Sequence, residues 1–135
     1  SYNTKNIKIL LFDQVGRPLS LIERLRLRGI GSHKLVITDA SKEIIELLKL
    51  DNNINYCNIE IRKKGIVIRF RSLLETYGLI IPYYKLIIFK GESNTYSFYK
   101  EKHHIKFLVE NKSTIFFLKK IIKLKTDFQN KIDLN

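Results

Sequence analysis

The sequence contains few of the residues that cross-link or interrupt a chain. Cys57 is the one cysteine among 135 residues, which excludes an intramolecular disulfide framework. Only two prolines and six glycines are present, a scarcity that argues against a low-complexity or disordered chain. The N-terminal residues lack the basic, apolar and small-residue pattern of a secretory signal. We therefore expect a folded protein in the reducing environment of the cytoplasm.

Long apolar runs and acidic residues are also scarce. Charged residues interrupt every apolar segment before it reaches the roughly 18–20 residues that a transmembrane helix needs. The 25 Lys and Arg outnumber the 13 Asp and Glu, for a net charge of +12. Residues 55–135 hold 16 of the basic and 7 of the acidic residues. Such a charge attracts nucleic acid or an anionic membrane or protein surface. The alternative is that it serves only solubility.

Length and composition predict a single domain over residues 1–135. A chain of this size with 44% hydrophobic residues supports one core and is too short for two ordinary domains. Within it, we separate an N-terminal αβ segment (residues 1–55) from a sheet and helix (residues 56–128). Alternation predicts strands at residues 7–12 and 34–38. Leu19 to Arg28 fits either a helical face or the alternation of a strand, and the capping box of Ser20 and Glu23 favours a short helix. A further helix is predicted from Thr38 or Asp39 to about Leu50.

The clearest pattern in the sequence is that of a β-hairpin over residues 57–71. Apolar and polar residues alternate up to Ile61 and again from Ile66. A two-residue turn at Lys64-Gly65 keeps apolar residues opposite one another, whereas a three-residue turn sets charged against apolar positions. Gly65 then supplies the positive φ of the turn. The predicted pairs are Ile61–Ile68, Ile59–Phe70 and Glu60–Arg69.

Four more strands and a terminal helix follow the hairpin. The strands are predicted around residues 79–81, 86–89, 96–99 and 105–109, which gives about six from Cys57 onward. The helix should start at Asn111 or Ser113 as the cap and continue to about Phe128. At 100° per residue, one half of the helix is apolar. Its members are Ile115, Phe117, Leu118, Ile121, Ile122, Leu124 and Phe128. The opposite half carries lysines, and Phe116 lies among them.

These elements together predict an α+β protein: an antiparallel β-meander closed by a C-terminal amphipathic helix, with an additional αβ segment before it. The hairpin, the Ile80-Ile81-Pro82-Tyr83-Tyr84 segment and the terminal helix resemble bacterial pleckstrin-homology-like (PH/GRAM-like) domains, in which a helix closes one end of a bent β-sandwich. Residues 1–55 depart from that family's all-strand pattern. The stretch from Asn53 to Tyr84 also resembles small uncharacterised Bacteroidetes proteins, which carry a segment comparable to Leu73-Leu74-Glu75-Thr76-Tyr77. The resemblance implies a bacterial binding module that contacts proteins or lipid headgroups. Members that bind phosphoinositides use basic residues of the first hairpin.

Two basic surfaces are the candidate binding sites. The hairpin surface consists of Arg62, Lys63, Lys64, Arg69 and Arg71. The helix surface consists of Lys119, Lys120 and Lys123, with Phe116 beside them. We expect a non-enzymatic module that contacts an anionic protein or lipid-headgroup surface. The alternative is a nonspecific nucleic-acid-binding protein that uses both surfaces, with nearby tyrosines for stacking.

Histidine and cysteine form no recognisable metal or catalytic motif. His103 and His104 are adjacent on a predicted strand, so their side chains point to opposite faces. No second cysteine or histidine stands at metal-ligand spacing. Cys57 falls on the buried side of the hairpin, where it acts as a small apolar residue. We therefore expect no enzymatic activity, no cofactor and no metal. An exposed edge strand would allow two copies to pair as a homodimer.

Overall fold

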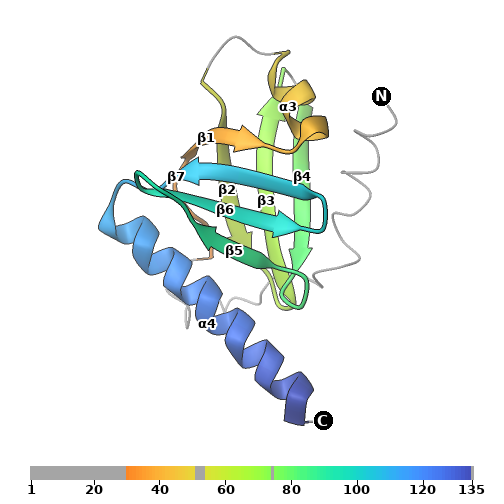
Figure 1. Cartoon of the computed structure of the whole chain (residues 1–135), viewed down its shortest axis with the longest axis vertical. Helices are drawn as coiled ribbons and strands as arrows, with labels where there is room; N and C mark the ends of the chain where they lie inside the picture. Colours follow the sequence, from red (N-terminus) through yellow and green to blue (C-terminus); the bar gives the residue numbers. More distant parts are fainter. Residues whose placement is uncertain (1–29, 51–53, 74, 135) are drawn as a thin grey trace.

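A computed structural model of the chain describes residues 30–50, 54–73 and 75–134. In these residues, seven antiparallel strands form one sheet in the order β4-β3-β2-β1-β7-β6-β5 (Figure 1). The strands are β1 (Leu35–Ala40), β2 (Tyr56–Ile61), β3 (Gly65–Ser72), β4 (Glu75–Pro82), β5 (Ile87–Lys90), β6 (Thr95–Lys100) and β7 (His103–Leu108). With the terminal helix α4 (Lys112–Leu134), they confirm the predicted α+β fold class. The strand predicted at residues 7–12 and the helix predicted at 19–28 lie outside the described residues.

The sheet curls because β1 belongs to both of its halves. Leu35 pairs with Cys57 of β2, whereas Ile37 pairs with Phe107 of β7, and the register shifts between Ile37 and Asp39. Irregularities of this kind bend a strand and increase its twist. In Figure 1, β1, β7, β6 and β5 consequently cross in front of β2, β3 and β4. The apolar faces of both halves meet in a single core cluster that includes Ile59, Phe98 and Phe107.

The turn between β2 and β3 lies one residue earlier than predicted. Ile61 pairs with Ile66, and the Arg62 N–H donates to the Gly65 carbonyl at 2.8 Å. The turn is therefore Lys63-Lys64, and Gly65 is the first residue of β3. The predicted pairing of β2 with β3 was wrong by two residues. A shift of two residues leaves every side chain on the face of the sheet where it was predicted. Alternation alone could not distinguish the two registers.

The short helix α3 (Lys42–Leu48) begins later than predicted because β1 continues to Ala40. Ser41 is its N-cap residue, and its hydroxyl makes no cap hydrogen bond. Ile44 and Leu48 are buried in the same core cluster as the strands. The apolar spacing thus identified the helix correctly, whereas its start was decided by the pairing of β1 with β7.

Helix α4 covers the core along one stripe and extends past the sheet (Figure 1). Asn111 caps it: its Oδ1 accepts a hydrogen bond from the Thr114 N–H at 2.9 Å. Phe117, Leu118 and Ile121 join the core cluster as predicted. The predicted apolar half was too wide, however, because Ile115 and Ile122 are 39% and 43% exposed.

Candidate functional site

The structure removes Arg62 from the predicted hairpin surface. Its side chain is only 4% exposed, and its Nε donates to the carboxylate of Glu60. Arg69 Nη1 donates to the same carboxylate at 2.9 Å. Burial raises the pKa of Glu60, but the hydrogen bonds and charges of the two arginines outweigh this effect and hold that pKa below its ordinary value. Arg62 is therefore a buried structural cation.

The other hairpin cations lie near opposite ends of the strands. Lys63 and Lys64 are exposed at the turn, and Arg71 is exposed near the end of β3. At about 3.3 Å per residue, Arg71 lies roughly 23 Å along the strand from Lys64. These lysines lie in the turn that joins β2 to β3, whereas β1 and β2 are connected through α3. The predicted hairpin surface is thus two separate surfaces.

Tyr83 holds the Lys63-Lys64 turn beside α4. Its hydroxyl donates to the Arg62 carbonyl at 3.1 Å, and its N–H donates to the Lys64 carbonyl at 2.9 Å. From the helix, Lys125 Nζ donates to the Tyr83 carbonyl at 3.1 Å. Burial raises the pKa of the Tyr83 hydroxyl, which therefore remains a neutral donor. The turn lysines and the second half of the helix consequently lie at the same end of the molecule.

The predicted helix surface is apolar as well as basic. Phe116 is 57% exposed, and the two isoleucines that were predicted to be buried lie on the same solvent-facing side of α4. Lys119 and Lys123 are exposed between these apolar side chains. No Asp or Glu occurs between residues 112 and 126. We call this surface the outer face of α4; it consists of Ile115, Phe116, Lys119, Ile122 and Lys123.

Lys120, the third lysine predicted for this surface, lies at its border. It is half-buried, and its Nζ is 5.0 Å from the centre of the Phe116 ring, within the range of a cation–π contact. Lys123 Nζ is 3.3 Å from the carboxylate of Asp127 one helical turn later. An exposed pair of this kind is worth well under about 1 kcal/mol, so it leaves Lys123 available to another anion.

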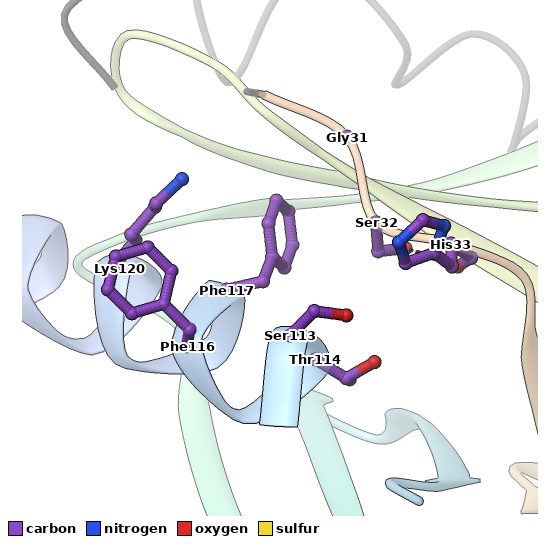
Figure 2. Close-up of a pocket in the computed structure, with 8 residues that line it drawn as sticks. All are labelled: Gly31, Ser32, His33, Ser113, Thr114, Phe116, Phe117 and Lys120. Carbon is purple, nitrogen blue, oxygen red and sulfur yellow. Dashed lines mark hydrogen bonds between the residues drawn. The ribbon is translucent and has the colours of Figure 1, made fainter. Parts of the chain in front are cut away.

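A pocket of about 180 Å³ lies between the N-terminal end of α4 and the segment that leads into β1 (Figure 2). Its lining residues are Gly31, Ser32, His33, Ser113, Thr114, Phe116, Phe117 and Lys120. In Figure 2, the hydroxyls of Ser113 and Thr114 point toward His33. Both hydroxyls donate to Asn111 Oδ1, at 2.8 and 2.9 Å. These polar groups therefore already serve the helix cap.

A larger groove of about 620 Å³ lies on the outer side of β2 and β3. We call it the arginine groove. It is lined by Lys34, Ile54, Asn55, Tyr56, Cys57, Asn58, Arg69, Phe70, Arg71, Leu73 and Thr76. Arg69 and Arg71 of the predicted hairpin surface both line it, and the Lys34 ammonium stands 5.4 Å from the centre of the Tyr56 ring. The sequence did not indicate that Lys34 and Tyr56 belong to a binding surface, because the residues around them form no motif. Only the pairing of β1 with β2 and of β2 with β3 places them near Arg69 and Arg71.

The nucleophilic and histidine side chains have structural surroundings. Cys57 is 2% exposed, and burial raises the pKa of its thiol to about 12, so it stays protonated. His103 Nδ1 is 3.5 Å from Glu43, and His104 Nε2 is 3.9 Å from Asp39. These pairs link β7 to α3 and β1. Among the residues that the structure describes, no three His, Cys, Asp or Glu side chains are grouped to hold a metal ion.

No family model matches the chain, and neither the curated proteins nor the solved structures contain a match. In the described ranges, no helix is both long and apolar enough to cross a membrane. Within the described residues, the outer face of α4 and the arginine groove both combine cations with exposed apolar or aromatic side chains, which makes them candidate binding surfaces.

Proposed function

We propose that the protein is a non-enzymatic binding module that docks on anionic lipid headgroups through the outer face of α4. One observation carries this proposal: Ile115, Phe116 and Ile122 are exposed on the same helix face as Lys119 and Lys123. Apolar side chains interspersed with lysines are typical of helices that lie in the interface of an anionic membrane, and here no Asp or Glu precedes Asp127 in the helix. The proposal includes a relationship to the PH-like domains, which is supported by the curled antiparallel sheet and the terminal helix of the described residues.

The surface has the two ingredients that interfacial binding requires. The apolar side chains enter the boundary between headgroups and acyl chains, where full burial of one of them is worth about 1.5–3 kcal/mol. Each lysine near an anionic leaflet contributes about 1 kcal/mol more. Lys63 and Lys64 lie at the end of the molecule where Tyr83 meets Lys125, so they extend the positive charge beyond the helix.

Sedimentation with vesicles tests the proposal. The parent protein should sediment with phosphatidylcholine vesicles that contain phosphatidylserine and remain in solution with phosphatidylcholine alone. Lys119→Gln combined with Lys123→Gln should weaken binding about 30-fold, from roughly 2 kcal/mol of lost attraction. Phe116→Ser should weaken it about tenfold or more.

Each variant has a matched control elsewhere on the surface. Lys42→Gln with Lys49→Gln removes the same charge from exposed positions on and beside α3. Phe89→Ser removes a ring of β5 that is also 57% exposed. Neither control should change binding. The proposal is wrong if the parent does not bind the anionic vesicles, or if the controls weaken binding as much as the variants of α4.

A further inference from the structure

The arginine groove is a second surface, and it shares no residue with the outer face of α4. Strand pairing places several of its lining residues in one row across neighbouring strands of the sheet. Arg71 of β3 pairs with Thr76 of β4, and Tyr56 of β2 pairs with Val36 of β1. Because Cys57 pairs with Phe70, Tyr56 and Arg71 are neighbours on the next row. A cation and an aromatic ring thus stand side by side on rigid strands.

The charge of the groove favours a dianion. Lys34, Arg69 and Arg71 contribute three positive charges to the lining, while Glu60 beside them shares its negative charge between Arg69 and the buried Arg62. Arg71 is exposed and makes no ion pair with another residue in the described part of the chain. Its guanidinium can therefore offer two parallel N–H donors to a phosphate, the geometry that arginine supplies and lysine does not.

The remaining lining favours a flat ring attached to that phosphate. Tyr56 is 42% exposed and offers a stacking surface beside Arg71. Asn55 and Asn58 also line the groove, and an asparagine amide offers both a donor and an acceptor, which suit the edge of a nucleobase. The groove, at about 620 Å³, falls within the usual range of ligand sites. A lipid headgroup would supply the phosphate but no aromatic ring to stack on Tyr56.

We infer that the arginine groove binds a nucleotide unit, with its phosphate on Arg71 and Lys34 and its base against Tyr56. The unit is either a free nucleotide or one residue of a single-stranded nucleic acid. Both sources offer the same phosphate ester and planar base. Stacking next to cations is the general way in which proteins bind single strands without sequence preference.

Fluorescence anisotropy of the full chain with fluorescein-labelled oligothymidylate tests the inference over a range of salt concentrations. Tyr56→Leu should weaken binding about tenfold and leave the salt dependence unchanged, because it removes stacking and no charge. Arg71→Gln should weaken binding and lower the slope of log K against log salt by about 0.7, the value for one phosphate contact to a single strand. Circular dichroism should show both exposed-site variants folded like the parent.

Two controls separate the groove from general charge attraction. Tyr84→Leu alters another exposed tyrosine, and Lys119→Gln with Lys123→Gln alters the outer face of α4; both should bind oligothymidylate like the parent. If thymidine monophosphate competes as well as unlabelled oligothymidylate at the same concentration of nucleotide units, a free nucleotide is the ligand; if it competes far more weakly, the single strand is the ligand. The inference is overturned if the parent does not bind at low salt. It is also overturned if Tyr56→Leu binds like the parent, or if the α4 variant loses binding.

Discussion

The contact between Glu60 and Arg62 gives the sharpest test of what stabilises the β2–β3 hairpin. Arg62 is 4% exposed, so the protein has removed nearly all water from its charge, and Glu60 is the carboxylate that compensates it. Glu60→Gln keeps the shape and one acceptor but removes that compensation. Breaking a buried ion pair from one side costs about 3–5 kcal/mol. Since Glu60 is itself 22% exposed, we expect the low end, about 3 kcal/mol.

Urea unfolding followed by circular dichroism measures this loss as a lower midpoint at an unchanged slope. The loss should depend on pH. Because the pKa of Glu60 is lowered by folding, its contribution is fully present above the unfolded value of about 4.3 and disappears as the pH falls through the lower folded pKa. The parent and Glu60→Gln should therefore converge in stability in acid.

A second variant keeps the reasoning open to refutation. Glu60→Gln combined with Arg62→Met removes the buried charge as well as its partner, and it should recover most of the lost stability. If Glu60→Gln lowers the free energy of unfolding by less than about 1 kcal/mol at neutral pH, the account is refuted, because an exposed surface ion pair alone can contribute up to about 1 kcal/mol. The account is also refuted if the double variant is no more stable than Glu60→Gln, because the uncompensated charge of Arg62 would then not be the cause of the lost stability.

Two further contacts make specific predictions. Asn111→Ala removes the acceptor of the Thr114 N–H and should lower the free energy of unfolding, measured in urea, by about 1 kcal/mol. Asn111→Asp keeps an acceptor and should cause no such loss. Equal losses in the two variants would show that Asn111 does not act as the cap. Tyr83→Phe leaves the buried Arg62 carbonyl without its hydroxyl donor at 3.1 Å and should cost about 1–3 kcal/mol, whereas Tyr84→Phe, at a 58% exposed ring, should cost nothing measurable.

Sequence periodicity was reliable where the neighbours along the chain decide the outcome. Alternation over residues 57–71 predicted the hairpin and its buried side, including Cys57, because successive side chains of a strand must point to opposite faces. It could not fix the turn, because pairing that slips by two residues preserves both faces. Nor could it show that Arg62 is buried while Lys63 and Lys64 are exposed.

The terminal helix shows the same division. A cap residue followed by apolar residues at helical spacing predicted where α4 begins, and Phe117, Leu118 and Ile121 are buried as expected. The width of the buried stripe depends on the partner surface, which the sequence of the helix does not contain. Ile115 and Ile122 fall outside the contact and become part of the outer face of α4.

The sequence by itself therefore determined the fold class and the residues at the centre of the buried side of β2, β3 and α4, since these follow from periodicities of 2 and 3.6 residues. Only the tertiary structure decided which cations share a surface. Lys34 and Arg71 are far apart in the chain, and they line one groove because β1 pairs with β2 and β2 with β3. Register between strands depends on packing over the whole sheet, and local patterns leave it open.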